Sequence, residues 1–276
     1  MKRTVLVAII SSLSLVACAQ QDDEDKLYRP TDLAVVDTAM FVTFNYHPVG
    51  SYTDNQLTAD FKNIKWVMTS ERAKIVEDAE RGRVLEVFFP KGSVGPQQGG
   101  IQFVRNLPPN KEYYLDYYLK FDAAFDFNLG GKLPGLTSGG ETYTGGVHPT
   151  EGQGWSARYM WTDKMPVVYL YYVDMNDTYG ESLALSTKFE KGKWYRITQF
   201  IKINDSDKTN AEITVWLDGK MVAKKQNFRL RIGTKGLIDS FYFSTFHGGN
   251  TTDWAARNDC YIYFDNLLVT TKPVKF

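Results

Sequence analysis

Cysteine is nearly absent from this sequence of 276 residues, which contains only Cys18 and Cys260. A framework of several disulfide bonds is therefore excluded, and a modified Cys18 would leave Cys260 without any partner. Cys260 begins CYIYFDNLLVT, an apolar run that we interpret as a β-strand. We therefore expect a buried and unreactive thiol at this position.

The sequence also contains few histidines and has no net charge. The sequence has three histidines without the paired spacing of a zinc site, and 32 basic residues balance 32 acidic ones. A neutral chain gives no reason to expect nucleic acid as a partner. The oxygen-rich segment DMNDTYGE (174–181) does not match the spacing of an EF-hand calcium loop. We expect neither a metal ion nor another cofactor.

Motifs of several hydrolytic enzymes are missing as well. No Gly-x-Ser-x-Gly elbow supports a serine hydrolase, and GLTSGGE (135–141) lacks the lysine of a phosphate-binding loop. Asp163, Asp174 and Asp177 do not alternate along one strand as a pair of glycosidase carboxylates would. A glycoside hydrolase is therefore our third and weakest hypothesis.

One long apolar run stands at the N-terminus, from Val5 to Ala17, directly after Lys2 and Arg3. This arrangement is typical of a secretory signal. The run ends in LVAC, which resembles the lipobox of bacterial lipoproteins, in which the cysteine receives the lipid. We predict a lipoprotein signal peptide over residues 1–17; an ordinary cleaved signal is the alternative.

The predicted lipid on Cys18 would tie the protein to a membrane. Residues 18–35 are polar and acidic at their start, which suits a tether between a membrane and a folded domain. Ala19 is not the aspartate expected of inner-membrane retention, so we predict anchoring to the outer membrane, on its periplasmic or cell-surface side.

Residues 36–276 are predicted to form one all-β domain, a jelly-roll β-sandwich of two antiparallel sheets with few short helices. Helical spacing is weak throughout, and only the region from Thr69 to Glu80 suggests a turn or two. Asp218-Gly219 is a strong signal for a two-residue hairpin turn. The sequence otherwise consists of short runs rich in Tyr, Phe, Val and Ile, as in sandwich proteins. Examples are RVLEVFFP, EYYLDYYLKF, PVVYLYYVD, KWYRITQFIKIN and DSFYFSTF.

A hairpin is predicted from GWSARYMW (154–161) and PVVYLYYVD (166–174). If Trp161 lies opposite Pro166, one face of this hairpin carries the polar residues and the other carries a credible core. A register slip by one residue would exchange the faces, and a solvated outer face is the alternative interpretation. The polar set is Ser156, Arg158, Tyr169 and Tyr171; the apolar set is Trp155, Ala157, Tyr159, Trp161, Val168, Leu170 and Tyr172.

Such a polar face suits β-elimination of a uronic acid. A cation neutralises the carboxylate, a base removes the proton from the adjacent carbon, and an acid protonates the leaving oxygen. The rigid, planar guanidinium of Arg158 can bind a carboxylate. A tyrosine can donate or accept a proton if a nearby cation lowers its pKa. Lys132, within the glycine-rich GGKLPGL (130–136), could supply that cation or act as a base.

The sequence resembles polysaccharide lyase family 14, the alginate and glucuronan lyases with a β-jelly-roll fold. The resemblance covers most of the chain from about residue 83, and GGKLPGL followed by GWSARYMW and YLYYVD is its most specific part. Its other elements are PQQGGIQF (96–103), KGKWYRI (191–197), VWLDGK (215–220), FSTFHGGN (243–250) and FDNLLV (264–269).

The resemblance implies which residues line the active cleft. They are the lysine before LPG, the serine and arginine of the strand and the two tyrosines, here Lys132, Ser156, Arg158, Tyr169 and Tyr171. We expect Arg158 and Lys132 to neutralise the carboxylate, Tyr169 and Tyr171 to move the protons, and Ser156 to hydrogen-bond the substrate. Lys132 as the base remains an alternative. The glycines around Lys132 are interpreted as letting a loop approach the sugar.

Two further segments have predicted roles. His247, between a strand and two glycines, is a candidate substrate contact at the cleft edge, whereas His148 is interpreted as an ordinary loop residue. The long polar segment 137–153 departs from the family pattern, and we expect it to shape one wall of the cleft.

The leading hypothesis is thus a lipid-anchored polyuronate lyase that acts on alginate, with polymannuronate as the first choice, or on glucuronan. The alternative of another class is a non-catalytic lipoprotein that binds glycans on the same sandwich fold.

Overall fold

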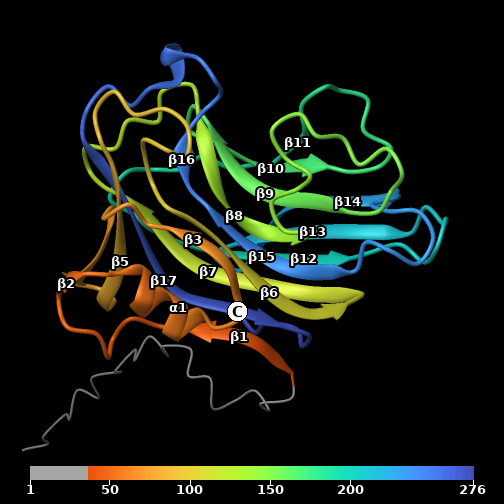
Figure 1. Cartoon of the computed structure of the whole chain (residues 1–276), viewed down its shortest axis with the longest axis horizontal. Helices are drawn as coiled ribbons and strands as arrows, with labels where there is room; N and C mark the ends of the chain where they lie inside the picture. The colour runs from red at the N-terminus through yellow and green to blue at the C-terminus, as the bar shows by residue number, and fades with distance from the viewer. Residues whose placement is uncertain (1–36) are drawn as a thin grey trace, which may run out of the picture. The chain divides into compact units, whose positions relative to one another are not determined.

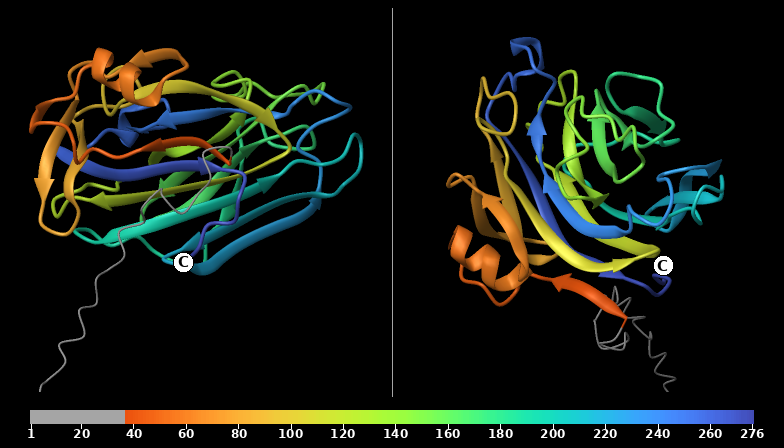
Figure 2. Two further views of the ribbon diagram at one scale, coloured as in Figure 1. Left: turned by 90° about the horizontal axis from the view of Figure 1, so that it is seen from below. Right: turned by 45° about the vertical axis from the view of Figure 1, so that its right-hand side comes forward.

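Two antiparallel sheets dominate the computed structural model, which describes residues 37–276 (Figure 1). The predicted jelly-roll β-sandwich is confirmed. Figure 2 shows the two layers from two further sides. The predicted signal peptide, Cys18 and the tether over residues 18–35 lie outside the described residues. Within the described part, no helix is long and apolar enough to cross a membrane.

The larger sheet has nine strands. Its order is β14 (Lys220–Phe228), β13 (Ala211–Leu217), β12 (Trp194–Lys202), β7 (Glu112–Phe121), β17 (Cys260–Thr270), β5 (Gly82–Phe89), β4 (Ala73–Asp78) and β2 (Gly50–Ser51), with β1 (Thr38–Val42) also pairing with β17. Cys260 is buried at the start of β17, as predicted, and burial raises the pKa of its thiol to about 12.

The smaller sheet has eight strands and carries the residues of interest. Its order is β11 (Glu181–Ala184), β10 (Met165–Tyr171), β9 (Trp155–Thr162), β8 (Gly131–Ser138), β15 (Ile238–Ser244), β6 (Gln102–Asn110) and β3 (Ile64–Met68), with β16 (Phe246–His247) also pairing with β8.

The core lies between the sheets and is rich in aromatic rings. Tyr117 of β7 and Tyr159 of β9 meet across the two layers with ring centroids 6.4 Å apart. Trp155 and Trp161 of β9 are fully buried in the same cluster. Because aromatic side chains bury large apolar areas, this cluster is the main source of hydrophobic stabilisation of the sandwich.

The hairpin predicted from β9 and β10 forms in the expected register. Trp161 lies opposite Pro166, Arg158 opposite Tyr169, and Ser156 opposite Tyr171. The apolar set of the prediction packs into the core. Asp218 and Gly219 likewise connect β13 to β14 and both have positive φ, as a two-residue hairpin turn requires.

One helical prediction is wrong. The region from Thr69 to Glu80 contains strand β4, whose alternate residues Ala73 and Ile75 are buried. The α-helix α1 lies earlier, at Asp54–Phe61, where Thr53 and Gln56 form a capping box. That box is readable in the sequence as TDNQ, but the helix is short and only weakly amphipathic. The structure also contains the 3₁₀ helix η2 (Thr252–Trp254).

The glycines around Lys132 do not form a loop against the sugar, which corrects our interpretation. Residues 131–138 are strand β8, in the interior of the smaller sheet. A Cβ atom at Gly131 would lie 2.2 Å from the Trp161 ring, and one at Gly135 would lie 2.3 Å from the carbonyl oxygen of Ala157. These glycines therefore allow β8 to pack closely against its neighbours.

Candidate active site

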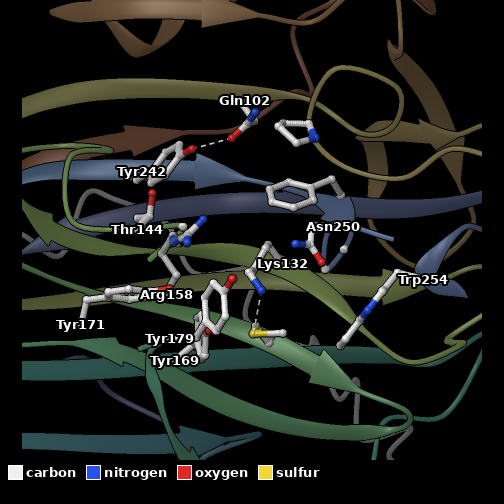
Figure 3. A pocket seen from close by; sticks show the side chains of 16 residues that line it. Gln102, Lys132, Thr144, Arg158, Tyr169, Tyr171, Tyr179, Tyr242, Asn250 and Trp254 are labelled. Atoms are coloured by element: carbon white, nitrogen blue, oxygen red, sulfur yellow. Dashed lines mark hydrogen bonds between the residues drawn. The ribbon is translucent and has the colours of Figure 1, made fainter. Parts of the chain in front are cut away.

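A cavity of about 530 Å³ lies over the outer face of the smaller sheet. Its floor comes from the strands β6, β8, β9, β10 and β15, and loops at both ends of these strands provide its walls. The floor presents mainly polar and aromatic side chains, which include Gln102, Lys132, Arg158, Tyr169, Tyr171 and Tyr242 (Figure 3). The predicted residues Lys132, Arg158, Tyr169 and Tyr171 are thus brought together.

Arg158 is a buried cation without an acidic partner. Its side chain is on β9 and only 2% of the residue is exposed. Its Nη1 donates to Ser244 Oγ at 3.0 Å, and its guanidinium lies 4.9 Å from the centre of the Tyr242 ring. No carboxylate among residues 37–276 forms an ion pair with it, and its Nε has no hydrogen-bond partner there. A buried, uncompensated charge is costly, so this arrangement favours an anionic ligand.

Lys132 stands beside Arg158 on the neighbouring strand β8. Its Nζ lies 4.5 Å from the centre of the Tyr169 ring and 2.9 Å from Met160 Sδ. Burial, and then the positive charge of Arg158, lower the pKa of Lys132 well below its ordinary value of 10.5. The amine therefore loses its proton more readily than a solvent-exposed lysine does, which is the property of a general base.

Tyr169 and Tyr171 project from β10 on the same face. Their rings meet edge to face, with centroids 5.4 Å apart and an angle of 85° between the planes. Burial, and then the neighbouring Tyr171, raise the pKa of Tyr169 above its ordinary value. Tyr169 is therefore protonated at neutral pH, so its hydroxyl has a proton to give but is not a ready base. The backbone N–H of Gly146 donates to Tyr171 Oη at 3.1 Å, which fixes that hydroxyl.

Ser156 is on the predicted face but is covered by the chain itself. It is fully buried, and its Oγ donates to the carbonyl oxygen of Tyr143 at 2.7 Å. The residue anchors the loop 139–154 and does not line the cavity. The structure therefore does not bring Ser156 to the cavity with the other predicted residues, and its hydrogen bond to the substrate stays a prediction.

His247 is not at the cleft edge, contrary to the prediction. Pairing of β16 with β8 turns its side chain into the core, where it stacks on Phe125 with centroids 5.5 Å apart. Its Nε2 lies 2.6 Å from the carbonyl oxygen of Asp126, and burial lowers the pKa of the imidazole. The residue is fully buried and does not line the cavity, so its role is in packing.

The predicted wall from segment 137–153 is present. Thr144 and Gly145 line the cavity at one end of the strands. Glu141 of the same segment forms an ion pair with Lys65 at 3.0 Å, which ties the loop to β3. Tyr179, from the loop after β10, lines the cavity on this side.

The opposite wall comes from the chain that follows β16. Asn250 and Trp254 line the cavity there, and Phe246 adds a second ring (Figure 3). Asn250 lies in the segment FSTFHGGN, which carries part of the family resemblance, so the sequence contained a signal for this residue. The sequence gave no signal for Trp254, which ends the 3₁₀ helix η2, or for Tyr179 in the loop after β10, because the strand pattern does not determine the course of either segment.

The sequence matches the family model of polysaccharide lyase 14 over residues 77–267, which is most of the chain. The chain belongs to polysaccharide lyase family 14. That match includes every floor residue described above, from Gln102 to Tyr242.

Solved structures of lyases resemble this one closely. The alginate lyase Aly36B is 26% identical, with a TM-score of 0.76 over 87% of this chain and 99% of that one. The marine PL-14 alginate lyase from Aplysia kurodai is 28% identical, with a TM-score of 0.73 over 85% and 99% of the two chains. Alginate lyase vAL-1 from Chlorella virus shares the fold at 21% identity, with a TM-score of 0.67 over 81% and 99%. No curated protein matches the chain.

Proposed function

We propose that this polysaccharide lyase cleaves a polyuronate, alginate in the first place, by β-elimination. The observation that carries the proposal is the buried guanidinium of Arg158, which lacks an acidic partner among the described residues and borders the cavity beside Lys132 and Tyr169. A chain of uronic acids supplies the missing carboxylate on every sugar.

The structural neighbours support alginate as the substrate class. Aly36B variants have been solved in complex with an alginate tetrasaccharide and an alginate trisaccharide, and both structures are 26% identical to this chain. We take polymannuronate as the first candidate and glucuronan as the second.

Arg158 would begin the reaction by holding the carboxylate of the reacting sugar, while Lys132 stands beside it as a neutral amine. The proton on the adjacent carbon C5 is weakly acidic, and neutralising the carboxylate stabilises the enolate-like transition state that forms when this proton leaves. Because Arg158 is buried, its fixed guanidinium acts more strongly than a solvated cation would.

The lowered pKa of Lys132 and its position 4.5 Å from the centre of the Tyr169 ring support the following proton transfers. The neutral amine of Lys132 takes the proton from C5, and the electron pair of the C5–H bond forms the C4–C5 double bond. The bond from C4 to the bridging oxygen breaks, and Tyr169 donates its hydroxyl proton to that oxygen. The assignment of Lys132 as base replaces the proton removal that we first expected of a tyrosine. Tyr171 packs against Tyr169 in an edge-to-face contact and so helps to fix the position of the Tyr169 ring.

Incubation with polymannuronate, polyguluronate and glucuronan tests the proposal. Each elimination leaves an unsaturated uronate that absorbs in the ultraviolet, so absorbance is expected to rise with at least the mannuronate polymer. Absence of product with all three polymers across a broad pH range would overturn the proposal.

Tyr169→Phe separates a lyase from a protein that only binds glycans. Removing the proton donor is expected to lower turnover by about 10²–10⁴-fold while most of the affinity remains. Tyr114→Phe is the matched control, because Tyr114 stacks on Phe200 in the other sheet. Binding without any product in the unmodified protein would favour the non-catalytic alternative.

We further propose that Cys18 carries a lipid that anchors the enzyme to the outer membrane. The support for this proposal is the sequence of the N-terminal segment described above.

A further inference from the structure

We infer that Gln102 is a second substrate-binding residue, whose side-chain amide donates a hydrogen bond to the carboxylate of a uronate unit beside Arg158. This inference rests on the proposed function. It concerns a residue on β6, which the strands β15 and β8 separate from Arg158 on β9.

The orientation of the Gln102 amide follows from a chain of hydrogen bonds that begins at Arg158. A guanidinium can only donate, so Ser244 Oγ accepts from Arg158 Nη1 at 3.0 Å. The hydroxyl proton of Ser244 then has to point elsewhere, and it is donated to Gln102 Oε1 at 3.2 Å. Ser244 is fully buried, so no solvent competes for that proton.

Tyr242 supports the same orientation from a second direction. Its hydroxyl donates to Gln102 Oε1 at 2.5 Å, so this one oxygen accepts two protons (Figure 3). The carbonyl side of the amide is therefore occupied by Ser244 and Tyr242. The N–H groups of Nε2 have no hydrogen-bond partner among the described residues, although only 4% of Gln102 is exposed. Gln102 lines the cavity, so these donors are available to a ligand there.

The position of this donor matches the chemistry of the substrate. Arg158 and Gln102 both hydrogen-bond to Ser244 Oγ, so both groups face the same small region of the cavity. Tyr242, which donates to Gln102, also lies 4.9 Å from the Arg158 guanidinium, and no acidic side chain within residues 37–276 forms an ion pair with Arg158. The floor thus offers donors and positive charge, which together select an anionic oxygen.

A binding experiment distinguishes a direct contact between Gln102 and the substrate from an indirect effect of Gln102 on Arg158 through Ser244. The parent is the Tyr169→Phe variant of the full chain, and the probe is a mannuronate trisaccharide followed by calorimetry. Gln102→Met is added to this parent, and then to the parent that also carries Ser244→Ala. Because Ser244→Ala cuts the connection to Arg158, the double-mutant cycle isolates what Gln102 does by itself.

Direct contact predicts that Gln102→Met weakens binding about tenfold to a hundredfold in both backgrounds, as loss of a hydrogen bond to a charged group does. An unchanged affinity would overturn the inference, and so would a loss that disappears when Ser244→Ala is present. Gln226→Met, at an exposed position of β14 in the other sheet, is the matched control and is expected to leave binding unchanged.

Two further outcomes are distinguishable. If Gln102→Met does not fold, Gln102→Glu keeps both acceptor contacts and replaces only the donor, and affinity equal to that of the parent would then overturn the inference. If the parent itself does not bind the trisaccharide, the glucuronan trisaccharide is titrated in its place. Failure of both would overturn the proposed function and this inference with it.

Discussion

Two arginines in this protein have opposite relations to stability. Arg81 donates from Nε to Asp265 at 2.8 Å, and its guanidinium lies 3.5 Å from the centre of the Tyr118 ring. Arg158 is buried, and its partners within residues 37–276 are the Ser244 hydroxyl and the Tyr242 ring, with no carboxylate among them. Arg81 therefore stabilises the fold, whereas Arg158 has the position that we propose for binding the carboxylate of the substrate.

Methionine substitutions are expected to separate these two roles. Arg158→Met removes an uncompensated buried charge, so we expect lyase activity to be lost while the midpoint of thermal unfolding stays the same or rises. Arg81→Met leaves Asp265 buried without its partner and is expected to cost about 3–5 kcal/mol of unfolding free energy. Calorimetric unfolding of both variants checks this, and a large loss of stability in Arg158→Met would contradict our assignment.

The lowered pKa of Lys132 predicts the pH dependence of catalysis. A base works in its neutral form, so kcat/KM is expected to rise with pH through the pKa of Lys132 and then level off. Because burial and Arg158 lower this pKa, the rise should occur well below pH 10.5. The measurement is the pH profile of kcat/KM, which reports the free enzyme.

Chemical rescue provides the control for this assignment. Lys132→Ala is expected to lower kcat/KM by about 10²–10⁴-fold and to lose the rise with pH. Small primary amines added to the buffer should restore part of the rate. Lys202→Met, at an exposed position of β12, should keep the normal profile. A pH profile that persists in Lys132→Ala would show that another group is the base.

Among the elements, the hairpin of β9 and β10 was the most predictable from the sequence. Its alternation of polar and apolar residues fixes which side chains share a face, and turn length fixes the register. The same pattern could not show that the loop 139–154 covers Ser156, because a loop follows no periodicity. It also could not show that β16 turns His247 inwards, since a strand of two residues leaves no recognisable pattern.

Strand β8 illustrates why a glycine can be misread. Gly135 sits at an irregularity in the pairing of β8 with β9, where a side chain would collide with the backbone of Ala157 and Arg158. From the sequence alone, GGKLPGL is equally typical of a turn, because glycine and proline are common there. Only the neighbouring strands reveal that close packing is the reason for the glycines.

Gly135→Ala is accordingly expected to destabilise the protein strongly. The added methyl group would lie 2.3 Å from a backbone oxygen, so we expect a loss of more than about 3 kcal/mol in the free energy of unfolding. Gly192→Ala is the comparison, because it has a positive φ of 74° but no neighbouring atoms within 4 Å. That change should cost only about 1–2 kcal/mol, from backbone strain. Equal losses in denaturant titrations would contradict the packing explanation.

At the scale of the whole molecule, the class of fold was readable because the chain consists largely of short runs rich in Tyr, Phe, Val and Ile, and few segments show helical spacing. The aromatic runs that the sequence displays are the strands that now fill the space between the two sheets. The cavity was only partly readable. Lys132, Arg158, Tyr169 and Tyr171 follow from motifs. Gln102 lies within PQQGGIQF, which carries part of the family resemblance, but no local pattern connects its strand, or the strand of Tyr242, to β9.

The proposed anchor predicts where the whole protein is found. If Cys18 carries a lipid, Cys18→Ala should move the protein from the membrane fraction to the soluble fraction of a bacterial host without changing kcat. Fractionation followed by an activity assay measures both quantities. Recovery of the unsubstituted protein in the soluble fraction would contradict lipidation.

Alternate residues of strand β9 face the interior and the cavity. Trp155, Ala157, Tyr159 and Trp161 fill the interior, whereas Arg158 and Met160 border the cavity. A substitution on the cavity side of β9 is therefore expected to act on binding, and one on the interior side to act on stability. The two properties are tied to different positions of the same strand, so each can be changed without the other.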